Sequence, residues 1–149
     1  MVIQRFILLL ALIALPSLSH AISISFKEPD TAAKTAIVQL PEKYSTTDIQ
    51  SMWIKLAANE KPYLFILPAD KCGASDCTIV GYKNTSKGWV KVYEVFGGDG
   101  LEILDRKTKK HNDIEQYESR GSGEYIVKTS KWNNGKYAEP VITKSDQRN

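Results

Sequence analysis

Two cysteines, Cys72 and Cys77, are the residues of this 149-residue chain with the clearest potential for chemistry, and they are its only cysteines. They enclose four residues: Gly73, Ala74, Ser75 and Asp76. In an oxidising compartment such a pair forms a disulfide. The spacing is not the Cys-x-x-Cys of redox proteins, and no histidine or further cysteine lies nearby to complete a metal site. We therefore predict a disulfide-closed loop with no metal and no cofactor.

The other residues that could catalyse a reaction form no recognisable set. His111 lies in a lysine-rich polar stretch, so we predict a surface histidine rather than a general base. Nucleotide-binding and zinc-protease motifs are absent from the sequence. Five carboxylates could pair as in a glycosidase, although nothing selects a pair among them: Glu60, Asp76, Glu94, Asp99 and Glu102. We therefore expect a protein that is not an enzyme.

The first 21 residues predict the compartment. One arginine precedes an unbroken apolar run from Phe6 to Leu15, and small residues follow at Ser19 and Ala21. This pattern is typical of a cleaved signal peptide, and the run is shorter than the roughly 20 apolar residues that span a bilayer. We predict a signal peptide over residues 1–21 and a single periplasmic or secreted domain over residues 22–149, with no stable membrane insertion after cleavage.

The mature chain predicts one helix followed by strands. Asp30 can cap a helix over residues 31–40, which Pro41 ends. Residues 52–56 alternate between apolar and polar positions, which favours a strand over a helix starting at Ser45 or Thr47. Tyr63–Leu67 is apolar almost throughout, so we expect it in the centre of a sheet. Further strands are expected at residues 78–82, 89–96 and 101–104.

The last third of the chain combines a polar stretch with a hairpin. Residues 105–123 contain few apolar anchors and are interpreted as a loop or a poorly packed helix. Asn134-Gly135 predicts a tight turn between strands on either side, and residues 144–149 are expected to fray. Together these elements predict an α+β fold, in which one N-terminal helix packs on a twisted antiparallel sheet of about five to seven strands.

The densest basic segment runs from Arg106 to His111. A nucleic-acid interface would need aromatic or arginine-rich neighbours on the same face, and an exported protein rarely meets nucleic acid. We therefore predict a solvated loop or strand edge here and no nucleic-acid partner, with a lipid or a wall polymer as the remaining alternative.

The segment around the cysteines resembles two groups of exported bacterial proteins. A strand, a C-x4-C loop with Asp76 before Cys77, and a second strand resemble the inhibitory loop of Ivy-type periplasmic lysozyme inhibitors. Those inhibitors carry a histidine where this chain has Ser75. Residues 52–137, with Cys72-Gly73, Cys77 and Gly135-Lys136-Tyr137, also resemble small exported β-rich proteins with a C-G-x-x-x-C loop. Many of those proteins have an Asp-rich calcium loop, whereas residues 57–61 here lack the carboxylates, so we predict no calcium.

These observations favour binding over catalysis. We expect a periplasmic inhibitor or immunity-type protein that occludes a cell-envelope enzyme, with Gly73, Ala74, Ser75 and Asp76 as the contact residues. A rigid loop binds a partner at a smaller ordering cost. The alternatives are an envelope structural or assembly factor that binds protein or glycan, and a hydrolase that uses a carboxylate pair.

Overall fold

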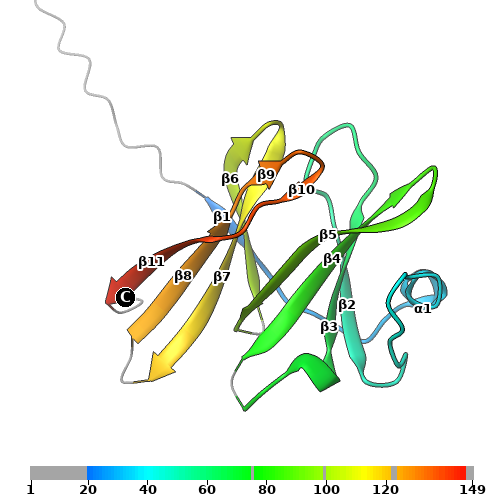
Figure 1. Ribbon diagram of the computed structural model, residues 1–149, viewed down its shortest axis with the longest axis horizontal. Helices are drawn as coiled ribbons and strands as arrows, with labels where there is room; N and C mark the ends of the chain where they lie inside the picture. Colours follow the sequence, from blue (N-terminus) through cyan, green and yellow to red (C-terminus); the bar gives the residue numbers. More distant parts are fainter. Residues whose placement is uncertain (1–19, 75, 99, 122–123, 147–149) are drawn as a thin grey trace, which may run out of the picture.

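The computed structural model describes residues 20–74, 76–98, 100–121 and 124–146, and Figure 1 shows how their strands and helices are arranged. Strands account for 58% of these described residues and helix for 8%, so the fold is all-β. They form a four-stranded sheet, a five-stranded sheet and a two-stranded hairpin. Within the described ranges no helix is long and apolar enough to cross a membrane. Residues 1–19 of the predicted signal peptide lie outside these ranges.

The four-stranded sheet is antiparallel, with its strands side by side in chain order. They are β2 (Ile49–Ile54), β3 (Tyr63–Pro68), β4 (Cys77–Thr85) and β5 (Gly88–Gly97). β3 is an inner strand and all of its residues are buried, which confirms the prediction from its apolar run. On β4, Gly81 makes room for the buried Phe65 ring, because a Cβ atom there would lie 2.8 Å from two ring carbons.

The five-stranded sheet is also antiparallel and has the order β1-β6-β7-β8-β11. Its strands are β1 (Ala21–Ile24), β6 (Leu101–Thr108), β7 (His111–Gly121), β8 (Glu124–Ser130) and β11 (Val141–Asp146). The two edge strands thus come from the two ends of the described chain. β1 reaches the sheet by pairing with β6, where Ile22 lies opposite Ile103.

Two neighbouring hairpins turn through residues with positive φ. The short strands β9 (Trp132–Asn133) and β10 (Lys136–Tyr137) are joined by Asn134 (φ 47°) and Gly135 (φ 88°), which confirms the predicted turn. β6 and β7 are joined by Lys109 (φ 49°) and Lys110 (φ 72°). This second turn uses the left-handed region at two positions without glycine, where a side chain is disfavoured.

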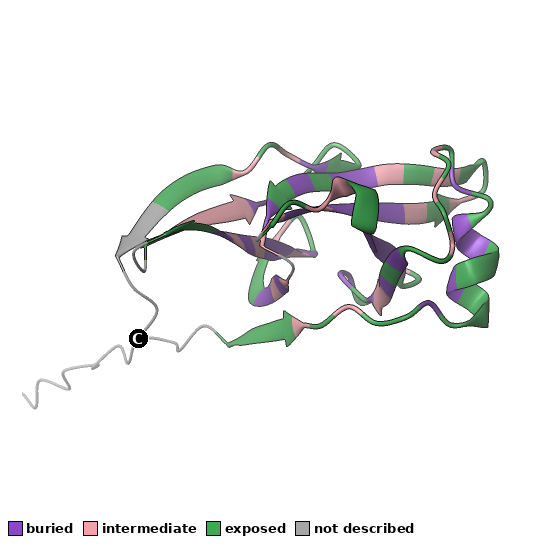
Figure 2. Ribbon diagram, turned by 90° about the horizontal axis from the view of Figure 1, so that it is seen from below, coloured by how far each residue is buried: buried purple, intermediate pink, exposed green. Residues whose placement is uncertain are grey.

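One apolar core lies between the sheets, and a second lies on the outer face of the four-stranded sheet. The first core contains buried residues from both sheets and from the β9–β10 hairpin, among them Phe65, Ile114 and Trp132. The second lies under helix α1 (Thr31–Ile37), whose Ala33, Ala36 and Ile37 pack on that sheet. Figure 2 shows buried residues along the strands and on one side of α1.

The predicted α+β class, with an N-terminal helix on one sheet, is therefore wrong. The capped helix exists, and the Asp30 carboxylate accepts a hydrogen bond from the Ala33 amide at 2.7 Å. However, α1 has seven residues and covers only part of one sheet, while the main core is formed between two sheets. A helix of that size is an addition to a β structure rather than one of its layers.

The polar stretch 105–123 was the main source of this error. Instead of a loop or a poorly packed helix, it forms the end of β6 and the whole of β7. The hydrophobic pattern does not reveal β7 because its buried positions include polar side chains that are paired inside the protein. Asp113 and Gln116, for example, are both fully buried, and Arg106 Nε lies 2.6 Å from the Asp113 carboxylate. Strand β11 likewise continues to Asp146, where fraying was expected.

Candidate functional site

The predicted disulfide between Cys72 and Cys77 is confirmed. It closes a loop that follows a short 3-10 helix, η1 (Ala69–Lys71), and leads into β4. Inside the ring the Gly73 amide donates to the Asp76 carbonyl at 2.7 Å, so the loop is closed by backbone as well as by sulfur. The bond indicates an oxidising, extracellular compartment.

The predicted contact residues differ in exposure. Gly73 and Ala74 are exposed, and Asp76 is half-buried. Ser75 lies outside the described residues. The loop therefore presents Gly73 and Ala74 to solvent, while Asp76 is partly covered by the protein.

Hydrogen bonds also hold the chain on both sides of the disulfide loop. The Ala69 amide at the start of η1 donates to the Asp48 carbonyl at 2.8 Å. On the other side, the fully buried Gln116 side chain of β7 donates to the carbonyls of Cys77 at 3.4 Å and Gly98 at 2.8 Å. Gln116 thus ties the loop, which belongs to one sheet, to the core of the other.

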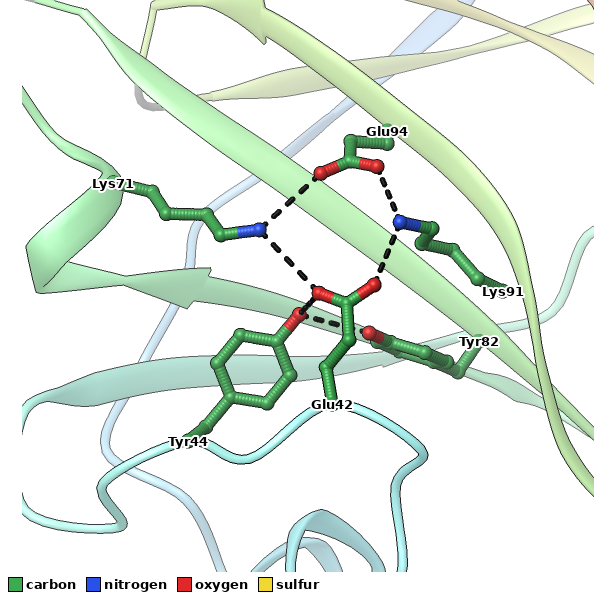
Figure 3. Close-up of polar contacts among 6 residues, drawn as sticks. All are labelled: Glu42, Tyr44, Lys71, Tyr82, Lys91 and Glu94. Carbon is green, nitrogen blue, oxygen red and sulfur yellow. Dashed lines mark hydrogen bonds and ion pairs between the residues drawn. The ribbon is translucent and has the colours of Figure 1, made fainter.

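Four charged side chains form a closed ring beside η1, and Figure 3 shows their contacts. Lys71 Nζ lies 3.4 Å from the Glu42 carboxylate and 3.2 Å from that of Glu94. Lys91 Nζ lies 2.6 Å from Glu42 and also contacts Glu94. We call these residues, Glu42, Lys71, Lys91 and Glu94, the ion ring. It connects the residue before Cys72 to β5 and to the segment after α1.

The ion ring has no net charge, and its carboxylates are strongly stabilised in their ionised form. The hydrogen bond from Lys91, followed by that from Tyr44, lowers the pKa of Glu42 to about 2. The pKa of Glu94 is lowered as well, chiefly by Lys91, and the hydrogen bond to Glu42 raises the pKa of Lys91. These groups consequently stay charged at neutral pH, and the ring persists there.

Two tyrosines extend the ion ring toward the sheet. The Tyr44 hydroxyl donates to Glu42 at 2.6 Å and lies 2.8 Å from the Tyr82 hydroxyl. Since the single hydroxyl proton of Tyr44 is used in the hydrogen bond to Glu42, Tyr82 is the donor in the second bond. Burial, then the hydrogen bond to Glu42, raises the pKa of Tyr44, so both hydroxyls keep their protons.

A hollow of about 300 Å³ lies next to the loop and is lined by Asp76, Glu102, Tyr117 and Tyr125. The Tyr117 hydroxyl donates to Glu102 at 3.1 Å. Ile24 and Leu101 also line the hollow, so its wall combines charged, aromatic and apolar side chains.

The five carboxylates considered for hydrolysis do not gather at one place. Asp76 and Glu102 line this hollow, whereas Glu94 belongs to the ion ring and Glu60 lies beside β3. Asp99 is outside the described residues. One pair therefore shares a site, and two other carboxylates are paired with lysines.

His111 is buried, so the prediction of a surface histidine is wrong. Only 7% of the residue is exposed, and its ring stacks on Trp132 with centroids 3.9 Å apart. Nδ1 lies 3.1 Å from the Lys109 carbonyl, which can only accept, so Nδ1 carries a proton. Nε2 faces the Tyr63 hydroxyl at 3.0 Å and Glu60 at 3.3 Å.

Glu60, which is half-buried, completes this cluster. Lys83 Nζ lies 2.9 Å from its carboxylate, and Tyr63 donates a hydrogen bond to it. Burial alone would raise the pKa of Glu60, but the hydrogen bonds from Tyr63, Lys83 and His111 outweigh it and lower the pKa. Both ring nitrogens of His111 have partners, so we interpret the cluster as a packing contact between sheets. No sequence spacing connects positions 60, 63 and 111, so nothing in the sequence indicated that these residues form a cluster.

Among residues 20–74, 76–98, 100–121 and 124–146, no group of three or more metal-ligating side chains comes together. Fold and site thus define an all-β protein with a rigid disulfide-closed loop, formed where oxidation is possible. No protein family model matches the chain, and no curated protein or solved structure is significantly similar to it.

Proposed function

We propose that this protein is a periplasmic inhibitor or immunity-type protein that binds and occludes a cell-envelope enzyme through the loop Gly73–Asp76. The observation that carries the proposal is the way this loop is held. A disulfide closes it, Gln116 and η1 fix its base, and Gly73 and Ala74 remain exposed at its tip. An ordered loop loses little conformational entropy on binding, so more of its contact energy becomes affinity.

The ion ring supports the same proposal. Lys71 directly precedes Cys72, and its ammonium group is held by two carboxylates from separate segments. These contacts restrain the chain where η1 leads into the loop. Such an arrangement suits a loop that must enter a concave site in a partner.

The test is capture of a partner from native periplasmic extract on the immobilised mature protein. The Ala74→Arg variant places a bulky charge at the exposed tip and should abolish capture without affecting the fold. Ser86→Arg, in the exposed turn between β4 and β5, is the matched control and should capture as well as the unmodified protein. Equal capture by both variants, or capture of no enzyme, would contradict the proposal.

The identity of the target can be narrowed in the same way. The resemblance to Ivy-type inhibitors makes a lysozyme the first enzyme to assay. We expect the unmodified protein to inhibit whichever enzyme it captures, and Ala74→Arg to relieve that inhibition. Capture without inhibition would favour a structural or assembly role instead.

Glycan binding is the second candidate, because a hollow of about 330 Å³ between α1 and the sheet has an aromatic wall and amide side chains. Trp53 and Trp89 line it with ring centroids 6.2 Å apart, beside Gln39 and Asn84. Apolar sugar faces stack on such rings. Sedimentation with insoluble peptidoglycan, lost in an Asn84→Ala variant, would favour this function. Release of soluble fragments would instead indicate a hydrolase that uses Asp76 and Glu102.

A further inference from the structure

The β6–β7 and β9–β10 turns lie side by side at one end of the molecule (Figure 1). Lys109 Nζ donates to the Asn133 side chain at 2.7 Å, which joins the two turns, and His111 stacks on Trp132 behind them. Five exposed lysines belong to these turns and the residues beside them: Lys107, Lys109, Lys110, Lys131 and Lys136. We call this group the lysine tip.

The β6–β7 turn has a backbone conformation that is unfavourable for the two lysines that form it. Lys109 and Lys110 both have positive φ, a conformation in which Asn-Gly is strongly preferred. The same protein uses Asn134-Gly135 for the adjacent turn. Two lysines at strained positions indicate that their side chains, rather than the turn geometry, are what this end of the molecule requires.

The charge of the lysine tip is only partly compensated. The exposed acids in the same segments are Asp105 and Glu139, and Asp105 lies 4.0 Å from His20. Arg106, which is also in β6, is paired with the buried Asp113. The two turns consequently present an excess of positive charge, although the whole chain has a formal charge of only +3.

We propose that the lysine tip docks on an anionic phospholipid surface. The lysines stand on two projecting turns, so a flat surface can approach them together, and lysine acts as a point charge that needs no shaped pocket. Each lysine near an anionic bilayer strengthens binding about fivefold.

The position of the lysine tip also agrees with the proposed function, on which this inference does not depend. In Figure 1 the turns lie at the top of the molecule, and η1 with the disulfide loop lies at the bottom. A protein docked by its lysine tip would therefore present Gly73 and Ala74 away from the membrane.

The test is sedimentation of the mature protein with vesicles of phosphatidylcholine, with and without phosphatidylglycerol. We expect binding to the anionic vesicles only, and loss of that binding near 1 M salt, where the Debye length falls to about 3 Å. The decisive variant is Lys109→Asn with Lys110→Gly, which installs the preferred turn. It should weaken binding about 25-fold while its thermal midpoint stays the same or rises, so unfolding cannot explain the loss.

The matched control removes two charges elsewhere, with Lys34→Gln in α1 and Lys43→Gln in the segment after it. Both residues are exposed, and these segments pack on the outer face of the four-stranded sheet, whereas Trp132 beside the two turns belongs to the core between the sheets. The control should bind like the unmodified protein. Equal weakening by both double variants would show a response to net charge and overturn the proposal. Binding to zwitterionic vesicles, no binding to either vesicle, or preferential binding to soluble polyphosphate would also overturn it. The capture experiment with Ala74→Arg does not depend on any of these vesicle results. Failure of membrane docking by the lysine tip can therefore be distinguished from failure of partner binding by the disulfide loop.

Discussion

Opening the disulfide should lower the free energy of unfolding by about 2 kcal/mol and leave the fold intact. Cys72 and Cys77 are five positions apart, and closing so short a ring removes little chain entropy from the unfolded state, about 2 kcal/mol on the loop-closure model. The core should survive because the Gly73–Asp76 backbone hydrogen bond and the Gln116 contacts do not depend on sulfur.

The assay is urea unfolding followed by tryptophan fluorescence, since Trp132 reports the core between the sheets and Trp53 and Trp89 report the core under α1. Oxidised and reduced unmodified protein are compared with a Cys72→Ser, Cys77→Ala variant. Alanine is chosen at position 77 because Cys77 is buried in the apolar core, where a serine hydroxyl would add its own cost.

The reduced protein and the variant should share one midpoint, below that of the oxidised protein, with unchanged dependence on urea. An unchanged midpoint, with the bond verified by thiol titration, would show that ring closure contributes nothing. A loss above about 4 kcal/mol would show that the bond holds the core itself, because it exceeds what closure of so short a loop supplies. Either result would refute the reasoning.

Three further outcomes are expected. Gly81→Ala should lose about 1–3 kcal/mol of stability by urea titration, because the new Cβ would lie 2.8 Å from the Phe65 ring. Gly73→Ala, whose Cβ would meet nothing closer than 3.6 Å, should lose far less, and an equal loss would contradict this account. Because the folded pKa of Glu42, about 2, lies below its ordinary value of 4.5, ionised Glu42 stabilises the folded protein above about pH 4.5, and this contribution is lost as the pH falls toward 2. The Glu42 carboxylate is 37% exposed, so after allowance for solvent screening the loss in the free energy of unfolding is about 1 kcal/mol. A Lys91→Met variant with the same pH dependence of stability would contradict this assignment to Glu42. His111→Phe keeps the aromatic stack but removes the ring nitrogens that contact the Lys109 carbonyl and the Tyr63 hydroxyl. It should lower the free energy of unfolding by about 1–3 kcal/mol. An unchanged midpoint in thermal unfolding would show that these hydrogen bonds do not stabilise the protein.

The sequence was sufficient to predict those features that depend only on residues close together in the chain. Asn134-Gly135 turns a hairpin because both residues accept positive φ, Asp30 caps α1, and the disulfide joins nearby cysteines. The central position of β3 was equally readable, because a strand buried on both faces must be apolar throughout.

The rest could not be predicted because it depends on contacts between distant residues. His111 contacts Tyr63 of the other sheet and Glu60 in the loop before β3. The buried polar residues of β7 are paired as well, Asp113 with Arg106 of β6 and Gln116 with Tyr93 of the other sheet. The ion ring is similar, since Glu42 and Lys91 meet only after the four-stranded sheet has formed. The loop residues of the candidate site were visible in the sequence, whereas the supports that hold them were not.

The pairing of β1 with β6 has a consequence for the order of folding. Ile22 lies opposite Ile103, so the five-stranded sheet cannot close until most of the chain is present, and contacts of such long sequence separation form slowly. In a chain that crosses a membrane from its N-terminus, the first strand would wait unpaired while the rest follows. The sulfur bond spans only a few residues, so it can be made early.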